Sequence, residues 1–519
     1  MQTVVSAHEM RWCDETAIRS FGVPGLLLMD RAGTGASHVL LTRYAPLTDR
    51  AVTVVCGSGN NAGDGFVVAR VLAHHGAHVQ VVLCVPPARL KGDAAAQFRM
   101  LRREERTNVD RLKIVALRSA MTSDSPQPAL VVDAVFGTGF TGRPSGAHAR
   151  AIEWMNRLHA PIASLDVPSG VDATTGLARG VAVRSALTIT FGMLKTGLLL
   201  NAGRPSAGHV VCIDIGIPRA ITGDRRLATR LIERGDVRLE LPARPHHVHK
   251  YSAGKVLVIA GSRGYTGAAT LTTMSALRSG AGAVVLAYPD AVHAVLAKKL
   301  TEPILLPVPS DSNGGYASQP SKELIDRLAW ADVLLIGPGI GRSPETAQFV
   351  QAVFDVYRGP AVIDADALHV LPSVGLTRNK RRDWIVTPHS GEFSPLVGLP
   401  PSSIEEDRVE VTRAFARRTA WTTVLKGSPT CTAEANGTVT INSTGNPGMA
   451  TVGSGDVLAG LVAGFRAQGM TSAAAAWSGV YIHGRGGDLA RERLGERSLL
   501  AGDILDSIPH AVHEMEMRG

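Results

Sequence analysis

A glycine-rich stretch near the C-terminus holds the residues of this sequence that are best suited to group transfer. Gly453-Ser454-Gly455-Asp456 directly precedes an apolar segment that we expect to form a helix. Unpaired N–H groups at the start of a helix can hold an anionic phosphoryl group during its transfer. Asp456 stands where a carboxylate could take a proton from an attacking hydroxyl, although an isolated Asp would also serve as an ordinary cap. We interpret this stretch as a phosphoryl-transfer site.

A polar loop near the N-terminus is the second candidate binding site. The loop GSGNNAGDG (57–65) follows an apolar run and opens a predicted helix. Its G-x-G-x-x-A spacing formally matches a dinucleotide fingerprint, but the next strand ends in Cys84-Val85-Pro86, where a ribose-binding acid is expected. The loop can instead bind a ligand through backbone N–H groups and side chains, or form a tight turn with a capped helix. The polar side chains that it offers belong to Asn60, Asn61 and Asp64.

Two aspartates lie at the ends of further predicted strands. Asp133 belongs to the run 130–137, and Asp166 is followed by Ser169 in LDVPSG (165–170). Neighbouring strand ends could bring Asn61, Asp133 and Ser169 together, and their oxygen atoms suit a hard cation. Asp166 would then be free for acid–base work, since burial can tune a carboxylate toward neutrality. Either aspartate alone could equally cap the segment that follows it.

Several loops of the C-terminal half also follow predicted strands. Lys426 and the amides after it form a candidate phosphate cradle, and His389 lies beside a strand end. The Walker A pattern does not occur in the sequence, so a nucleotide would bind here in another way. The loops are GSRGYTGAA (261–269), GPGIG (337–341), DADAL (364–368), TPHSGEF (387–393) and LKGSPT (425–430).

The elements that must position these residues are short apolar strands that alternate with longer helix-like segments. This alternation predicts parallel βαβ units, and therefore an α/β fold with two three-layer αβα domains. Segment 217–250 loses the strand periodicity, so we place the boundary near Gly235, with domains at 1–234 and 235–519. Open parallel sheets bind ligands at the carboxyl ends of their strands, so we expect one active site in each domain. The predicted strands are 51–56, 79–85, 130–137, 162–168, 187–192, 210–216, 255–261, 283–288, 333–339, 361–366, 384–388 and 422–427.

The composition excludes several classes of protein. Of 519 residues, 45% are hydrophobic and 19% are charged, which is typical of globular proteins, and 55 glycines favour turns and close backbone approach. The sequence shows no long apolar run, no pattern of a secretory leader and no C-x-x-C pair among its five cysteines. We therefore expect a cytoplasmic protein that does not bind membranes. The formal charge of +9 could attract nucleic acid, but only 5% of the residues are aromatic. We therefore interpret the charge as suited to binding small molecules that carry phosphate groups. His246, His247 and His249 are interpreted as a solvated linker rather than a metal site.

The N-terminal half resembles the epimerase domain of the bifunctional NAD(P)HX repair enzymes. LLLMDRAG (26–33), GSGNNAGDG, DAVFGTGFTG (133–142) and DVPSGVDATTG (166–176) occur in the family's order. The resemblance implies a Rossmann-like domain that interconverts the R and S forms of hydrated NADH or NADPH, with Asp166 at the reacting centre and K⁺ on Asn61, Asp133 and Ser169. Ser58 and Ala62 replace the family's usual proline and glycine, and Ala62 requires a negative φ. The implied substrate contacts are Asn60, Asn61, Ala62, Gly63, Asp64, Gly137, Thr138, Gly139, Phe140, Thr141, Gly142, Arg143 and Asp166.

The C-terminal half resembles the ribokinase-like dehydratase partner of the same enzymes. HKYSAGKVLVIAGS, YTGAA, GPGIG, DADAL, TPHSGEF, LKG and GSGDVLAG match in order across about 249–465. The resemblance implies dehydration of S-NAD(P)HX to NAD(P)H with ADP or ATP and Mg²⁺, and Val452 departs from the family's usual glycine. It implies substrate contacts for Ala268, Gly341, His389 and Asp456, and nucleotide contacts for Lys426, Gly427, Ser428, Pro429, Thr430 and Gly455.

The implied chemistry is coherent with the residues. Asp456 would deprotonate the added hydroxyl, the nucleotide would phosphorylate it, and phosphate would then leave with a push from the ring nitrogen. We expect a homo-oligomer. The fused layout of the two halves resembles bacterial forms of the family, and this resemblance favours ADP. One alternative is a vitamin or sugar kinase fused to a non-catalytic Rossmann-like module. Another is an RNA or protein adaptor fused to a kinase-like half, which would not need Asn61, Asp133, Asp166 and Ser169 together.

Overall fold

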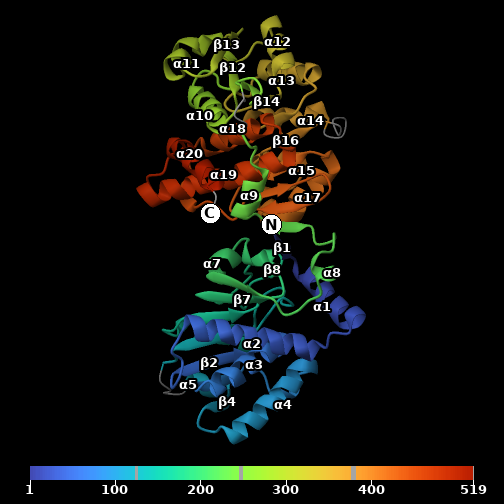
Figure 1. Ribbon diagram of the computed structural model, residues 1–519, viewed down its shortest axis with the longest axis vertical. Coiled ribbons are helices and arrows are strands. Elements are labelled where there is room, and N and C mark those ends of the chain that lie inside the picture. The colour runs from blue at the N-terminus through green and yellow to red at the C-terminus, as the bar shows by residue number, and fades with distance from the viewer. Residues whose placement is uncertain (123–126, 245–248, 376–381, 518–519) are drawn as a thin grey trace. The chain divides into compact units, whose positions relative to one another are not determined.

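The structure is a computed structural model that describes residues 1–122, 127–244, 249–375 and 382–517 (Figure 1). By its internal contacts the chain divides into two compact units. The first unit is Thr3–Ala228, and the second is Thr229–Gly519 together with Met1–Gln2. The domain boundary after residue 234 stays a prediction, and His246 and His247 of the predicted linker lie outside the described ranges.

The first unit is built on a seven-stranded parallel sheet in the order β4-β3-β2-β5-β6-β7-β9. Val54 in the middle of β2 pairs with Val81 of β3 on one side and Val132 of β5 on the other. These strands are apolar at nearly every position because both faces of the sheet are covered. Their bounds are β2 Ala51–Cys56, β3 His78–Leu83, β4 Leu112–Ala116, β5 Leu130–Ala134, β6 Ile162–Leu165, β7 Leu187–Phe191 and β9 His209–Ile213.

Two cores lie on opposite faces of this sheet. Val54 and Val132 belong to the larger core, whereas their chain neighbours Val55 and Val131 point into the smaller one. The larger core is covered by α1 (Ala7–Phe21), α2 (Gly25–Arg43), α3 (Asn60–His74) and α4 (Gly92–Thr107), and the smaller by α5 (Leu117–Thr122) and α6 (Gly146–Arg157). The remaining elements are β1 (Gln2–Val5), its parallel partner β8 (Leu194–Lys195), η1 (Pro87–Arg89), η2 (Thr196–Leu198), α7 (Gly203–Ala207) and α8 (Arg219–Thr222).

The sheet of the second unit contains the order β13-β12-β11-β14-β15-β16-β17-β18-β19-β10. The pairs from β13 to β17 are parallel, whereas β17, β18 and β19 pair antiparallel. Strands of three residues leave little pattern in a sequence, so the β18–β19 hairpin was not predicted. The bounds are β10 Thr229–Leu231, β11 Lys255–Ile259, β12 Ala283–Pro289, β13 Ile304–Val308, β14 Val333–Ile336, β15 Ala361–Ile363, β16 Trp384–Val386, β17 Thr422–Leu425, β18 Cys431–Ala433 and β19 Val439–Ile441.

Helices cover both faces of this sheet as well. One core lies under α12 (Lys322–Trp330), α13 (Pro344–Val356), α15 (Ser390–Val397), α16 (Pro401–Glu406) and α17 (Arg408–Thr419). The opposite core lies under α10 (Thr266–Arg278), α11 (His293–Lys299), α18 (Ser454–Ala467) and α19 (Ser472–Leu494). A further core packs α18 and α19 against α9 (Arg234–Glu240) and α20 (Ala501–Glu516). The short elements are η3 (Asp290–Val292), η4 (Ala365–Val370), α14 (Leu371–Val374) and η5 (Pro447–Met449).

The predicted α/β class with parallel sheets is confirmed. Every predicted strand is present, but most end two or three residues earlier than predicted, because the chain leaves the sheet to form the loops that hold the candidate site residues. Across the ranges that the structure describes, no helix is both long enough and apolar enough to cross a bilayer.

Helix α18, which carries Asp456 near its start, crosses α10 at very close range. A Cβ at Gly460 would lie 2.3 Å from the Thr272 carbonyl oxygen, and one at Gly464 would lie 1.8 Å from Ser279 Oγ. Ser275 Oγ also donates a hydrogen bond of 2.5 Å to the Val457 carbonyl. The crossing therefore tolerates only glycine at these two positions of α18.

We predict that Gly460→Ala lowers the stability of the second unit by about 1–3 kcal/mol, because the new methyl group must push α18 away from α10. Thermal unfolding followed by circular dichroism measures the loss. Gly502→Ala in α20 is the matched control, since a Cβ there meets no atom of the described chain within 4 Å. Equal melting temperatures for the two variants would contradict the prediction.

Candidate active sites

A cavity of about 730 Å³ lies in the first unit, where loops and helices follow β2, β5, β6 and β7. Most of the substrate contacts that were predicted for this unit line it. They are Asn60, Asn61, Asp64, Gly137, Thr138, Gly139, Phe140, Thr141 and Asp166. A side chain at position 137 would be tightly confined, because a Cβ there would lie 3.0 Å from Asp166 Oδ2 and 3.2 Å from Asn61 Cβ.

Four predicted contact residues are not among those that line this cavity. Ala62 is fully buried in the first turn of α3 and is not among the residues with positive φ, so its methyl group causes no backbone strain. A Cβ at Gly63 would meet Met29 Sδ, and Arg143 packs against Gly180. Gly142 adopts a φ of 87°, in the left-handed region that favours glycine. Substrate contact stays a prediction, both for these four residues and for the nine that line the cavity.

Asp166 is held as a carboxylate at the end of β6. Its Oδ1 lies 2.6 Å from Lys195 Nζ, and its Oδ2 accepts hydrogen bonds from the Thr138 backbone N–H, at 2.8 Å, and from the Thr138 hydroxyl. Burial alone would raise the pKa of Asp166, but the Lys195 ammonium and the Thr138 donors outweigh it and lower that pKa. The φ of Asp166 is 66°, an uncommon backbone conformation that this network of contacts maintains.

Two other carboxyl groups of the same cavity have pKa values that are raised rather than lowered. Burial, followed by repulsion from Asp166 and Asp14, raises the pKa of Asp64 well above its usual value. Burial also raises the pKa of Asp14 to about 6, although the Lys195 ammonium opposes this shift. The surroundings in this cavity therefore shift the pKa values of its carboxyl groups in opposite directions.

The three predicted K⁺ ligands are linked by hydrogen bonds, since Asn61 and Ser169 both contact the Phe136 carbonyl oxygen and Ser169 also contacts Asp133. Ser169 Oγ donates to Asp133 Oδ1 at 2.6 Å, and Asn61 Nδ2 donates to the carbonyl oxygens of Phe136 and Leu165 at 2.9 and 3.1 Å. Asn61 Oδ1 is buried and has no hydrogen-bond partner. A buried acceptor without a donor is costly, so a cation at this oxygen would satisfy it. The oxygen-only donor set fits a hard cation such as K⁺.

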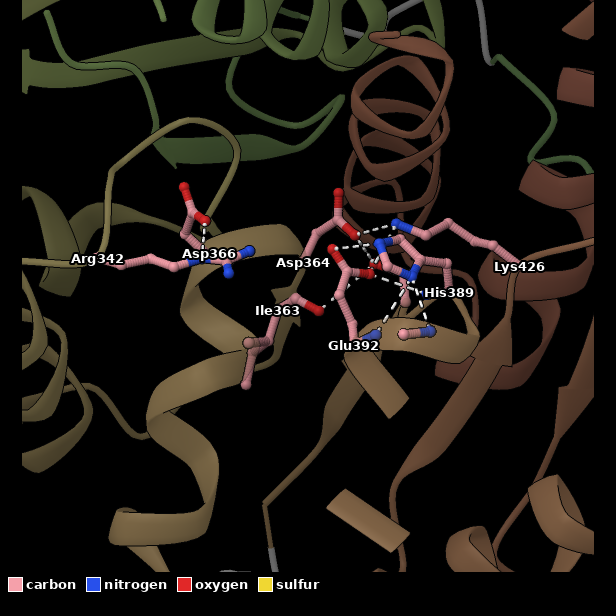
Figure 2. A network of polar contacts seen from close by, with 9 residues as sticks. Arg342, Ile363, Asp364, Asp366, His389, Glu392 and Lys426 are labelled. Carbon is pink, nitrogen blue, oxygen red and sulfur yellow. Dashed lines mark hydrogen bonds and ion pairs between the residues drawn. The ribbon is translucent and has the colours of Figure 1, made fainter. Parts of the chain in front are cut away.

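In the second unit, Lys426 at the end of β17 faces two carboxylates (Figure 2). Its Nζ lies 2.8 Å from Asp364 Oδ1 and 3.6 Å from Glu392 Oε2. Burial would lower the pKa of Lys426, but these carboxylates raise it above its usual value, so Lys426 is a cation. Asp364 is 1% exposed and also accepts from Thr387 Oγ1 at 2.7 Å, while its Oδ2 is buried without a partner.

The loop of the predicted nucleotide contacts is anchored from below by a buried arginine. Arg408, which is 1% exposed, donates from Nη2 to the carbonyl oxygens of Leu425 and Lys426 at 3.0 and 2.9 Å. A Cβ at Gly427 would lie 2.4 Å from the Arg408 guanidinium, so only glycine fits there. With those two carbonyls bound on the inner side, the loop can present its amide groups outward.

Helix α18 begins beside the same lysine. Gly453 caps the helix with a φ of 91°, and a Cβ at Gly455 would lie 3.2 Å from Lys426 Nζ. Asp456 stands in the first turn, where its pKa is raised to about 7, chiefly by burial and then by the Asp364 carboxylate, against the pull of Lys426. A carboxylate with a pKa near neutrality is suited to general-base work.

The other predicted substrate contacts of this unit lie after other strands of the sheet or at the start of the helix that follows them. Gly341 N donates to Asp366 Oδ2 at 3.1 Å, and Ala268 packs against the backbone of Gly339 in the same loop. His389 Nδ1 caps α15 by accepting from the N–H groups of Gly391 and Glu392, which leaves Nε2 as the donor of the ring. These neighbours do not test whether Ala268, Gly341, His389 or the loop residues Ser428, Pro429 and Thr430 touch ligand, so those assignments stay predictions.

Sequence reasoning missed several side chains that organise the two sites. Lys195 belongs to β8, shortly after the end of β7, and Asp14 comes from α1. Asp364 and Glu392 lie inside motifs that were noticed, but neither was assigned a role. The position of Asp364 directly after an apolar strand was the available signal, whereas Glu392 inside α15 and Arg408 at the start of the charged helix α17 gave none. Val452, the departure from the family pattern, is 98% exposed.

Comparisons with known proteins agree with this division of the chain. A family model described as NAD(P)H-hydrate dehydratase matches residues 256–510, and one described as YjeF-related protein N-terminus matches residues 25–197. A ribokinase-like superfamily protein from Enterococcus faecalis resembles the second unit, with a TM-score of 0.50 and 26% sequence identity. This likeness covers 56% of the present chain and 96% of that one.

Two curated relatives match nearly the whole length. Proteins named bifunctional NAD(P)H-hydrate repair enzyme from Moorella thermoacetica and from Salinibacter ruber are each 37% identical to this chain. The matches cover 99% and 98% of this chain, and 97% and 96% of the two relatives. The protein therefore belongs to the family of bifunctional NAD(P)H-hydrate repair enzymes, with an epimerase-type domain followed by a dehydratase domain.

Proposed function

We propose that this enzyme returns hydrated NADH and NADPH to their active forms through two reactions at two sites. The first unit interconverts the R and S epimers of the hydrate, and the second dehydrates the S epimer with ADP or ATP. The observation that carries the proposal is that each unit places a lysine–aspartate ion pair, Lys195–Asp166 or Lys426–Asp364, next to a further aspartate whose pKa is raised. Homo-oligomerisation, the choice of ADP and a cytoplasmic location stay predictions.

In the dehydratase site, Asp456 takes the proton of the substrate hydroxyl as that oxygen attacks the terminal phosphorus of the nucleotide. The free N–H groups at the start of α18 and the Lys426 ammonium stabilise the transferring phosphoryl group. Phosphate then leaves, with electron density supplied by the ring nitrogen, and loss of a proton from the adjacent carbon restores the double bond. Ala268, Gly341 and His389 hold the nicotinamide, while Lys426, Gly427, Ser428, Pro429, Thr430 and Gly455 hold the nucleotide.

Mg²⁺ accompanies the nucleotide in this proposal. Within the described part of the chain, no three His, Cys, Asp or Glu side chains are grouped so as to hold a metal ion alone. Mg²⁺ is commonly held by one or two carboxylates together with substrate phosphates, and the unpartnered Asp364 Oδ2 and the nearby Glu392 offer such a donor set. The ion would neutralise charge that develops on the phosphates.

In the epimerase site, Asp166 exchanges a proton with the oxygen atom at the reacting centre of the hydrate. Lys195 and Thr138 keep this carboxylate ionised and oriented. K⁺ on Asn61, Asp133 and Ser169 would add positive charge beneath the cavity, and the unpartnered Asn61 Oδ1 supports its presence. The start of α3 (60–64) and the loop 137–143 hold the substrate.

The dehydratase assignment is tested by incubating hydrated NADH with ADP or ATP and following the return of NADH absorbance and the release of phosphate. Asp456→Asn should slow the recovery by roughly 10²–10⁴-fold, because the hydroxyl loses its proton acceptor. Asp506→Asn, which changes an exposed aspartate of α20, is the charge-matched control and should recover NADH normally. A stable phosphorylated product without free phosphate would instead favour the kinase alternative.

The pKa of Asp456 predicts the acid side of the pH profile of this reaction. Because the folded-state pKa is raised to about 7, the carboxylate is lost by protonation as the pH falls through this value. We expect kcat/KM to fall about tenfold for each pH unit below about 7, since this parameter reports the ionisation of the free enzyme. A profile that stays flat between about pH 8 and pH 5.5 would remove Asp456 from the role of base.

The epimerase assignment is tested by supplying each epimer separately to the dehydratase reaction. Asp166→Asn should leave the R epimer unused, after correction for spontaneous epimerisation, while the S epimer is consumed at the normal rate. Asp30→Asn, an exposed aspartate on α2, is the control for loss of one negative charge in the same unit. Equal use of both epimers by Asp166→Asn would count against Asp166.

A further inference from the structure

The epimerase cavity contains a second buried carboxyl that the mechanism above leaves without a chemical role. Asp64 lies in the second turn of α3, lines the cavity and is 8% exposed. Among the described residues, no hydrogen bond or ion pair engages its carboxyl group. Other acids with this much burial in the chain, such as Asp133 and Asp166, are held by several donors. A carboxyl that is buried, unpaired and open to a ligand cavity is a candidate for chemistry.

The sheet places Asp64 and Asp166 on two sides of one space. Asp64 lies in the helix that follows β2, Asp166 directly follows β6, and β5 lies between these two strands in the sheet. The loop after β5 includes Gly137, whose missing side chain keeps open the space beside Asp166 Oδ2 and Asn61. Both carboxyls line the same cavity, so a planar ring bound there could meet Asp64 from the β2 side and Asp166 from the β6 side.

The surroundings of the two carboxyls favour opposite protonation states. Lys195 and Thr138 stabilise the charged form of Asp166. The charged groups nearest Asp64 are Asp166, Asp14 and Lys195, and the net effect of burial and the two carboxylates raises the pKa of Asp64 well above its usual value. Arg11, Glu15 and Asp93 also line the cavity. Two carboxyl groups whose pKa values are shifted in opposite directions by their surroundings are typical of a general acid and its partner base.

We propose that Asp64 is a second catalytic residue of the epimerase, a carboxylic acid that works from the face of the substrate ring opposite to the Asp166 carboxylate. This inference rests on the proposed epimerase activity of the first unit. It assigns to Lys195 the task of a positioning residue, because the ammonium keeps Asp166 ionised and so keeps the two carboxyls in different roles.

The step balances with water as the only other reactant. Asp64 gives its proton to the hydroxyl of the hydrate, the C–O bond breaks, and water departs while the ring nitrogen supplies electrons to form a planar C=N⁺ centre. A water molecule then adds to the opposite face and loses one proton to the Asp166 carboxylate. The turnover leaves Asp64 ionised and Asp166 protonated, which is the state required for the reverse reaction. Proton exchange with solvent resets the pair for another turnover in the same direction.

The decisive measurement on the unaltered enzyme is oxygen exchange in water enriched in ¹⁸O. Each epimerisation of R hydrate should place one solvent oxygen in the S product, in excess of the spontaneous background. Retention of the original oxygen during the first turnovers would overturn the proposal, because it would require opening of the C–N bond instead of the C–O bond. Complete absence of epimerisation would instead refute the proposed function of the unit, so the two failures differ.

Substitution of Asp64 provides a second, independent test of the proposal. Asp64→Asn keeps the size of the side chain but cannot supply the proton, so the epimerisation rate should fall by roughly 10²–10⁴-fold, with the dehydratase rate on S hydrate and the melting temperature unchanged. Asp64→Glu retains an acid and should recover part of the rate with full ¹⁸O incorporation. Asp30→Asn serves again as control. Epimerisation by Asp64→Asn within a few-fold of the unaltered enzyme would overturn the proposal.

Discussion

A lysine that is paired with an aspartate directly after a parallel strand organises each site. Lys195 Nζ lies 2.6 Å from Asp166 Oδ1 in the first unit, and Lys426 Nζ lies 2.8 Å from Asp364 Oδ1 in the second. Charges taken out of water are stable only when they are paired and further hydrogen-bonded. Thr138 provides the added donors for one pair and Thr387 provides one for the other. The chain around each pair must therefore hold strand ends, loops and helix starts in one arrangement.

The surroundings of the two lysines shift the pKa values of neighbouring aspartates in opposite directions. The cation beside Asp166 outweighs the effect of burial, so the pKa of this carboxyl falls below its usual value. Asp456 is also close to a lysine, but that lysine is shared with Asp364 and Glu392, and burial dominates, so its pKa rises. The difference suits the two chemistries, because a base that must accept a proton near neutrality benefits from a raised pKa.

Much of this organisation was predictable from local patterns. The apolar strands, the loops that follow them, and Asp133, Asp166 and Asp456 at their ends are all visible as short stretches of sequence. Lys195, Asp14 and Arg408 were not found, because their importance depends on partners that are distant along the chain. The requirement that Ala62 adopt a negative φ was stated from its side chain alone, and its position inside α3 meets this requirement. Which loop residues touch ligand depends on bound geometry and remains a prediction.

The separation of the hydrophobic cores has a consequence for how such a chain can arise. The two clusters around the first sheet lie within Thr3–Ala228, and the three clusters of the other unit lie within Thr229–Gly519. A segment with its own core can in principle fold alone. A gene that encodes this protein could therefore form by joining two ancestral genes, or be divided again, without exposing either interior. Fusion would then be maintained by the benefit of making both activities in equal amounts.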